Sequence, residues 1–121
     1  HALRLGSLKA QLGHSITASA AAGIIKLCGA FEASTLPPAP RVALEAPLPE
    51  FADTAFVLDP TVTEWRAASA PRRAGIDAFG FGGCNAHAIL DGPEAAEELR
   101  ATKATRGRRE AQSPPTPVAL A

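Results

Sequence analysis

The pattern of apolar and polar positions predicts one long helix early in the chain. Apolar side chains recur at helical spacing from Ser15 to about Ala33. The predicted apolar face consists of Ile16, Ala20, Ile24, Leu27, Cys28 and Phe31. Because the other positions are also mostly small and apolar, we expect a helix that is buried on several sides. Ser15 is the expected N-cap, and the prolines of residues 36–40 are expected to end the segment.

Shorter apolar runs predict strands before and after this helix. Leu3–Leu8 has the character of a short buried strand, and it is followed by an expected loop at Lys9–His14. Residues 37–50 include five prolines, which indicate an extended connection. Phe56–Trp65 predicts one or two edge strands, because Pro60 cannot donate a hydrogen bond within a central ladder.

Two further runs, Ala74–Phe79 and Asn85–Leu90, predict a β-hairpin with a wide and mobile tip. The tip contains Gly80, Phe81, Gly82 and Gly83. Three glycines around one phenylalanine indicate a backbone that approaches another group closely and a ring that can move. A glycine-rich hairpin tip is nevertheless more often structural than catalytic. A nucleotide-binding GxGxxG turn is not present, because Asn85 stands where the last glycine is required.

The composition indicates a globular chain with a thin core. Its 121 residues fit one domain, and 46% of them are hydrophobic, but many of these are alanines, which bury little area. The 12 basic and 12 acidic residues give zero net charge, which argues against non-specific electrostatic binding of nucleic acid. The chain contains no methionine and starts in the middle of a pattern. We therefore interpret it as a piece of a longer polypeptide.

Cysteine usage and hydropathy favour a cytoplasmic protein without a membrane span. Cys28 and Cys84 form neither a CxxC pair nor a disulfide framework, which is typical of a reducing compartment. No stretch approaches the roughly 18 apolar residues that a spanning helix needs. After Asp91 the sequence is rich in Glu, Ala and Arg and then reads SPPTPVALA. Residues 93–121 are therefore predicted to be a linker that is partly helical or disordered.

Lys9 and His14, in the stretch KAQLGH, form a candidate catalytic pair at a helix entrance. The positive end of the helix dipole favours a neutral imidazole, whose ring N–H can donate to a developing oxyanion. Lys9 would add positive charge nearby. The simpler alternative is that His14 satisfies a backbone carbonyl at the junction between loop and helix, and for an isolated histidine that alternative is the more common one.

Cys84 and His87 have CxxH spacing, which raises the possibility of a metal site. Two ligands without a second pair are weak evidence, and strand alternation would place them on opposite faces. We interpret the pair as structural and expect no metal. The basic cluster at residues 100–109 is interspersed with glutamates and is interpreted as a solvated helix or linker.

Several segments together resemble, in order, the C-terminal half of a β-ketoacyl synthase. They are LGSLKAQLGH, AAAGIIK, TLPP, a tryptophan and RRAGIDAFGFGGCNAHAILD. The resemblance extends over about residues 3–92, and it is strongest to the ketosynthase domains of polyketide synthases and polyunsaturated fatty acid synthases. It implies an α/β, thiolase-like fold, with residues 1–92 as the C-terminal portion of the domain. This portion would contribute a buried helix and strands of a mixed sheet.

The resemblance also implies an acyltransferase that performs a decarboxylative Claisen condensation in polyketide or fatty acid biosynthesis. A cysteine of the family holds the growing acyl chain as a thioester, and a malonyl unit loses carbon dioxide to give the enolate that attacks it. Both substrates are carried on the phosphopantetheine of an acyl carrier protein, and no cofactor is bound directly. The implied partners are the carrier protein, a second ketosynthase copy in a homodimer, and neighbouring synthase domains.

Two residues match catalytic positions of the family. His14 matches the second catalytic histidine, which would hydrogen-bond the malonyl thioester carbonyl and stabilise the enolate. Lys9 matches the lysine that orders the site through a buried glutamate located upstream.

The glycine loop matches the acyl gate. Phe81 corresponds to the gating phenylalanine, and its backbone N–H would complete an oxyanion hole with that of the nucleophilic cysteine. Gly80, Gly82 and Gly83 would let the loop approach the thioester and let the ring move aside.

The chain departs from the family at several positions. The nucleophilic cysteine and the first catalytic histidine are not present, and neither Cys28 nor Cys84 matches the nucleophile. Cys84 stands where the family usually has threonine, and Ala10 and Gln11 differ from the usual lysine-serine-asparagine pattern. We therefore expect this segment alone to be inactive.

Two alternatives stay open. The parent could be a chain-length-factor-like or decarboxylase-only partner that has lost its cysteine. The segment could also serve as a scaffold that supplies only dimer and carrier-protein contacts.

Overall fold

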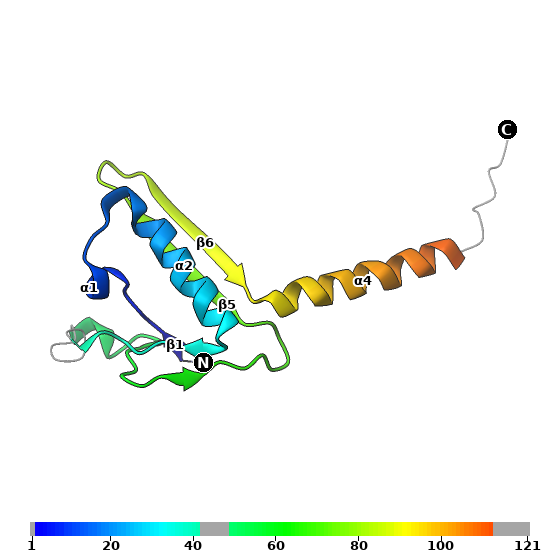
Figure 1. The fold of residues 1–121 in the computed structure, drawn as a ribbon, viewed down its shortest axis with the longest axis horizontal. Helices are drawn as coiled ribbons and strands as arrows, with labels where there is room; N and C mark the ends of the chain where they lie inside the picture. Colours follow the sequence, from blue (N-terminus) through cyan, green and yellow to red (C-terminus); the bar gives the residue numbers. More distant parts are fainter. Residues whose placement is uncertain (1, 42–48, 113–121) are drawn as a thin grey trace.

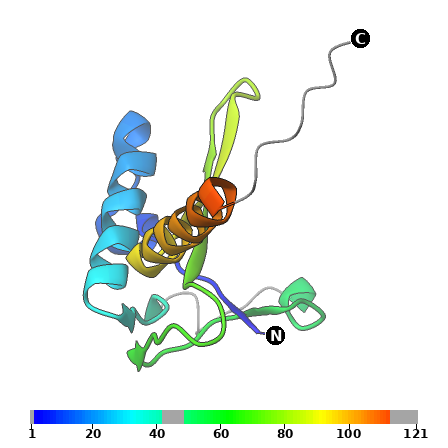
Figure 2. The same ribbon diagram turned by 90° about the vertical axis from the view of Figure 1, so that its right-hand side faces the viewer.

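The computed structural model describes residues 2–41 and 49–112. The elements follow in the order β1 (Leu3–Arg4), α1 (Lys9–Leu12), η1 (Ile16–Ala18), α2 (Ser19–Glu32), β2 (Thr35–Leu36), η2 (Pro49–Phe51), β3 (Phe56–Val57), β4 (Thr63–Glu64), β5 (Arg73–Phe79), β6 (Asn85–Asp91) and α4 (Pro93–Gln112). The helix α2 runs alongside the β5–β6 hairpin, and α4 projects away from them (Figures 1 and 2).

The strands form three sheets of two strands each. β1 pairs in parallel with β3, and β2 pairs antiparallel with β4. β5 and β6 pair antiparallel over their whole length, from Arg73 opposite Asp91 to Phe79 opposite Asn85. The predicted hairpin is therefore confirmed, with one further residue at the open end of each strand. The prediction of one or two short strands in Phe56–Trp65 is also confirmed, because β3 and β4 both lie there.

The prediction for residues 3–14 is wrong in two details. The first strand ends at Arg4 instead of Leu8, because its partner β3 is only two residues long and the last ladder bond runs from the Leu5 N–H to the Val57 carbonyl. The expected loop begins with the helical turn α1, which ends at Gly13 with φ of 80°. Of the predicted connection at residues 37–50, residues 42–48 lie outside the described part, and Pro49–Phe51 form the 3-10 turn η2.

The face by which α2 packs also differs from the prediction. Its less exposed positions are Ser19, Ala20, Ala22, Gly23, Lys26, Leu27, Ala30 and Phe31. Ile16, Ile24 and Cys28 of the predicted face are exposed. The reason lies in Gly23, where an added Cβ would stand 2.6 Å from the Ile76 Cδ1 on β5. The missing side chain lets the strand approach the helix there, and this turns the contact face away from the larger isoleucines.

Burial on several sides of α2 is likewise not found. Ala30 and Phe31 are buried, whereas Ile25 is 71% exposed. β5 covers one face of the helix, and the other faces lie open among the described residues (Figure 2). The expected thin core is confirmed, since the buried hydrophobic residues are Ala30, Phe31 and Ala39 within residues 2–41 and 49–112.

A single arginine connects α2, α4 and the segments that contain Ser34 and Trp65 at the C-terminal end of α2. The Arg72 guanidinium donates to the Phe31 carbonyl at 2.8 Å and to the Ser34 Oγ at 3.0 Å. It also forms a two-point ion pair with Glu94 in the first turn of α4, with both distances 2.9 Å. Phe31 stacks on Trp65 with ring centroids 4.7 Å apart, and the guanidinium lies over both rings. This group of residues, the Arg72 cluster, fixes the start of α4 to the rest of the chain.

The segment after Asp91 is helical as far as Gln112. Beyond its first turn, α4 extends away from the other elements (Figure 1), and residues 113–121 lie outside the described part. Its role as a linker stays a prediction. In the described part of the chain, no helix has the length and apolar character needed to cross a membrane.

Candidate active site

His14 lies between α1 and η1, where its ring is held by two neighbours. The Ile16 backbone N–H donates to His14 Nδ1 at 2.9 Å. The Ser19 Oγ, at the start of α2, lies 3.2 Å from the same nitrogen. Ser15 occupies the predicted N-cap position at the start of η1, but its side chain makes no capping hydrogen bond, and the N-cap residue of α2 itself is Ala18. The His14 ring provides the capping acceptor at η1 instead, because it accepts the otherwise free N–H at the start of the helical segment.

These hydrogen bonds determine which nitrogen of His14 faces outward as a donor. A backbone N–H can only donate, so Nδ1 of His14 must be the acceptor in its contact with Ile16. In the neutral ring the proton then resides on Nε2. The ring is exposed, so the Nε2–H is accessible to a ligand. The simpler expectation, that His14 satisfies a backbone carbonyl, does not describe this Nδ1 contact.

The backbone around His14 adopts conformations that are unfavourable for most residues. Gly13 has φ of 80° and ψ of 175°, a combination that is essentially restricted to glycine. Ile16 has φ of 49°, which is a genuine outlier for a β-branched residue. Such strain clusters at functional sites, and here it directs the Ile16 N–H toward the His14 ring.

Lys9 begins α1, and its backbone carbonyl accepts from the Gly13 N–H at 2.8 Å. The turn that contains Lys9 is tied to α2 by another side chain, since Lys26 Nζ donates to Gln11 Oε1 at 2.8 Å. Partial burial on α2 lowers the pKa of Lys26. Nothing in the sequence pattern indicated this contact, because Gln11 and Lys26 lie 15 residues apart along the chain.

The glycines of the hairpin tip are explained by the turn itself. Gly82 and Gly83 have φ of 93° and 85°, in the left-handed region. At Gly80 an added Cβ would stand 2.9 Å from the Cys84 carbonyl oxygen, which accepts the Gly80 N–H at 3.0 Å. The Phe81 ring is fully exposed at the tip. The loop therefore presents an uncovered aromatic ring on a backbone that only glycine accommodates readily.

The start of α2, next to His14, and the hairpin tip lie toward one end of the helix and strand pair, whereas α1, which contains Lys9, lies apart from that tip (Figure 1). The described hydrogen bonds of the His14 ring are to Ile16 and Ser19, and those of the tip run within the hairpin. Each group is thus held by its own local contacts.

Cys84 and His87 have different surroundings. His87 Nδ1 lies 2.6 Å from Asp77 Oδ1 across the β5–β6 pair, and both side chains are about half exposed. Cys84 is a free, exposed cysteine, as is Cys28. Within residues 2–41 and 49–112, no three histidine, cysteine or carboxylate side chains are grouped as a metal site would require.

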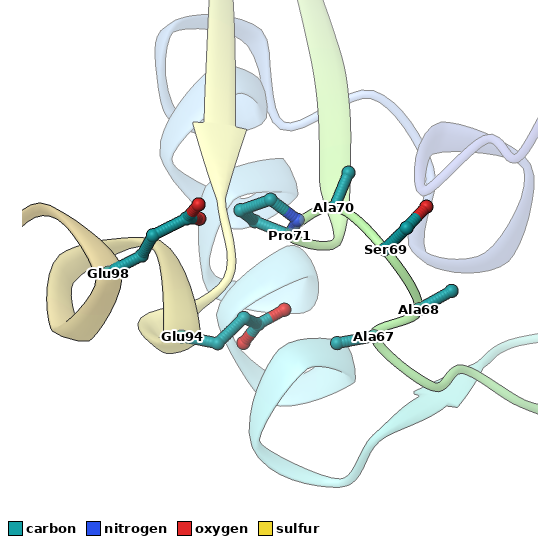
Figure 3. A pocket seen from close by; sticks show the side chains of 7 residues that line it. All are labelled: Ala67, Ala68, Ser69, Ala70, Pro71, Glu94 and Glu98. Carbon is teal, nitrogen blue, oxygen red and sulfur yellow. The ribbon is translucent and has the colours of Figure 1, made fainter.

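A shallow hollow of about 260 Å³ lies at the opposite end of α2, beside the Arg72 cluster. It is lined by Ala67, Ala68, Ser69, Ala70, Pro71, Glu94 and Glu98 (Figure 3). The Glu94 carboxylate is already engaged by Arg72, whose hydrogen bonds lower its pKa to about 2. The hollow marks the junction of α4 with the preceding loop and contains none of the predicted site residues.

The chain is similar to proteins of one known family. Residues 1–43 match the family described as Beta-ketoacyl synthase, C-terminal domain. One component of the phenolphthiocerol/phthiocerol polyketide synthase from Mycobacterium tuberculosis is 40% identical over 89 residues, which are 74% of this chain and 5% of the relative. The highly reducing polyketide synthase azaB from Aspergillus niger is 42% identical over 95 residues, 77% of this chain and 4% of the relative.

One relative is similar over nearly the whole chain. The spectinabilin polyketide synthase system protein NorA from Streptomyces orinoci is 37% identical over 116 residues, which are 96% of this chain and 6% of that protein. The chain contains the C-terminal part of a polyketide synthase ketosynthase domain. This ketosynthase segment spans a few per cent of the length of the relatives it matches.

Proposed function

We propose that the chain supplies the enolate-stabilising part of a condensing active site, within a synthase that performs decarboxylative Claisen condensation. The observation that carries the proposal is the held and exposed His14 ring, with Nδ1 occupied by a backbone donor and Nε2–H accessible. A fixed neutral donor can stabilise a developing oxyanion without giving up its proton.

His14 would act on the malonyl unit. Loss of carbon dioxide from a malonyl thioester leaves an electron pair that is delocalised onto the thioester oxygen as an enolate. The His14 Nε2–H would donate to that oxygen, and the enolate carbon would then attack the acyl thioester and release the cysteine thiolate. Lys9, five residues earlier, would order the site through an acidic residue of the parent protein.

Phe81 and its glycines would form the acyl gate. The exposure of the Phe81 ring and the left-handed conformations of Gly82 and Gly83 support this role. The Phe81 N–H would contribute to the oxyanion hole for the acyl thioester. The acyl and malonyl groups would be delivered on the phosphopantetheine of an acyl carrier protein.

The exposed apolar side chains support a place for this segment within a larger domain. Leu12, Ile16 and Ile25 are between 71% and 77% exposed along α1, η1 and α2. Such surfaces are usually covered by other protein. We propose that upstream parts of a thiolase-like ketosynthase domain cover them, that this domain forms a homodimer, and that residues 93–121 lead toward a neighbouring domain.

The test uses the complete synthase that contains this chain, incubated with an acyl thioester and then with a malonyl carrier protein. Peptide mapping by mass spectrometry should find the acyl group on a cysteine other than Cys28 and Cys84. His14→Ala should still become acylated but should form condensation product about 10²- to 10³-fold more slowly, the usual effect of removing one oxyanion donor.

His87→Ala is the matched control, because it removes the other described histidine, whose Nδ1 contacts Asp77 at an exposed position. It should retain product formation within about 3-fold, as expected for an exposed pair. A folded synthase that takes up no acyl group would contradict the proposal and favour a cysteine-less, non-condensing partner.

A further inference from the structure

We propose that Ser19 is a positioning residue for His14, an inference that rests on the proposed function. The Ser19 hydroxyl lies 3.2 Å from His14 Nδ1, the nitrogen that already accepts the Ile16 N–H at 2.9 Å. Ser19 would act by fixing the orientation of the ring, and it would not contact the substrate.

The direction of the Ser19 hydrogen bond follows from the Ile16 contact. Because the Ile16 N–H must donate, Nδ1 of His14 presents a lone pair. The Ser19 hydroxyl can then only donate to that nitrogen and shares the lone pair with Ile16. Both donors favour the same tautomer, with the proton on Nε2. Neither of them approaches Nε2, so the outward-facing donor stays available.

The two donors come from different elements, which is why both are needed. The first belongs to η1, where Ile16 is held at the unfavourable φ of 49°. The second is the first residue of α2, the helix that packs against β5. A ring held only through a strained turn can shift with that turn. The Ser19 hydroxyl would instead anchor the His14 ring to α2, which packs against β5.

The test is a set of variants of the complete synthase, assayed for release of carbon dioxide from a malonyl carrier protein. Ser19→Ala should lower kcat about 3- to 10-fold, the effect expected from one hydrogen bond. KM for the malonyl carrier protein and the rate of acylation by the acyl thioester should stay unchanged. Ser19→Thr, which keeps the hydroxyl, should restore most of the rate.

Ser15→Ala is the matched control. It makes the same chemical change beside His14, but the Ser15 side chain makes no capping hydrogen bond. Its kcat should remain that of the wild type. A merely structural role of Ser19 would instead lower acylation and decarboxylation together.

His14→Ala, assayed alongside, separates the two proposals. If His14→Ala decarboxylates at the wild-type rate, the proposed function is wrong. If His14→Ala is strongly impaired while Ser19→Ala equals wild type, or if Ser19→Thr fails to recover activity lost in Ser19→Ala, only the assignment of Ser19 is wrong.

Discussion

The two ends of α2 have opposite physical character. At the C-terminal end, Phe31 and Arg72 are buried, the rings are stacked and the guanidinium is fully engaged. At the N-terminal end, His14 is exposed and lies next to left-handed backbone at Gly13 and Ile16. The C-terminal end contributes packing and ion pairing. The N-terminal end instead contains strained backbone on either side of the His14 ring. In the proposed function the exposed N-terminal end supplies the chemistry, whereas the C-terminal end supplies packing and folding stability.

The largest effect on stability is expected from Phe31→Ala. The Phe31 ring is 6% exposed and stacks on Trp65, so its removal leaves a cavity beneath the Arg72 guanidinium. The free energy of opening, measured by hydrogen exchange at the amides of α2 in the complete synthase, should fall by about 3–5 kcal/mol. Leu99→Ala, at an exposed position on α4, should change it by about 0.5 kcal/mol or less. Equal effects of the two substitutions would contradict the comparison.

The ion pair at the same end predicts a pH dependence. Hydrogen bonds from Arg72 lower the pKa of Glu94 from 4.5 to about 2, so the folded state favours the ionised carboxylate. The stabilisation is complete above about pH 4.5 and is lost as the pH falls toward 2. Exchange protection at the start of α4, corrected for the intrinsic exchange rate, should therefore decrease over this range. Glu94→Gln and Arg72→Gln should both abolish this pH-dependent decrease in protection. An unchanged pH profile in either variant would contradict the assignment of the decrease to the ion pair.

The smallest stability effect is expected at the hairpin tip. Gly83 has φ of 85° and open space around its Cα, so Gly83→Ala would introduce backbone strain without a side-chain clash. Hydrogen exchange at the β5–β6 amides should report a loss of about 1–2 kcal/mol. Gly6→Ala, where an added Cβ also meets open space and φ is not left-handed, serves as the control and should leave these amides unchanged. A tolerated Gly83→Ala would show that the tip does not require its left-handed conformation.

Local patterns predicted the elements better than their contacts. The two strand-like runs at residues 74–79 and 85–90, with the glycines between them, predicted the hairpin, because the pairing partners there are close in sequence. The helix was predicted to within a few residues, but its packing face depended on Gly23 opposite Ile76, a contact across more than 50 residues. Nothing near Arg72 in the sequence indicated Glu94 as its partner.

The candidate site could also be predicted only in part, because motifs identify residues but not the contacts between them. His14, Lys9 and the residues of the hairpin tip were identified from motifs, and their roles stay predictions. The structure added the Ile16 and Ser19 contacts of His14, which depend on an unusual φ that the identity of a β-branched residue does not indicate. Ser19 lies five residues after His14, so the contact could be inferred only once the backbone conformation between the two residues was known.

The most direct test of the account measures chemistry and stability in the same variant. His14→Ala in the complete synthase should release carbon dioxide from a malonyl carrier protein about 10²- to 10³-fold more slowly than wild type. Exchange protection at the C-terminal end of α2 should stay unchanged, because His14 lies at the other end. Wild-type release of carbon dioxide by a folded His14→Ala protein would contradict the central claim that this end of α2 performs the chemistry.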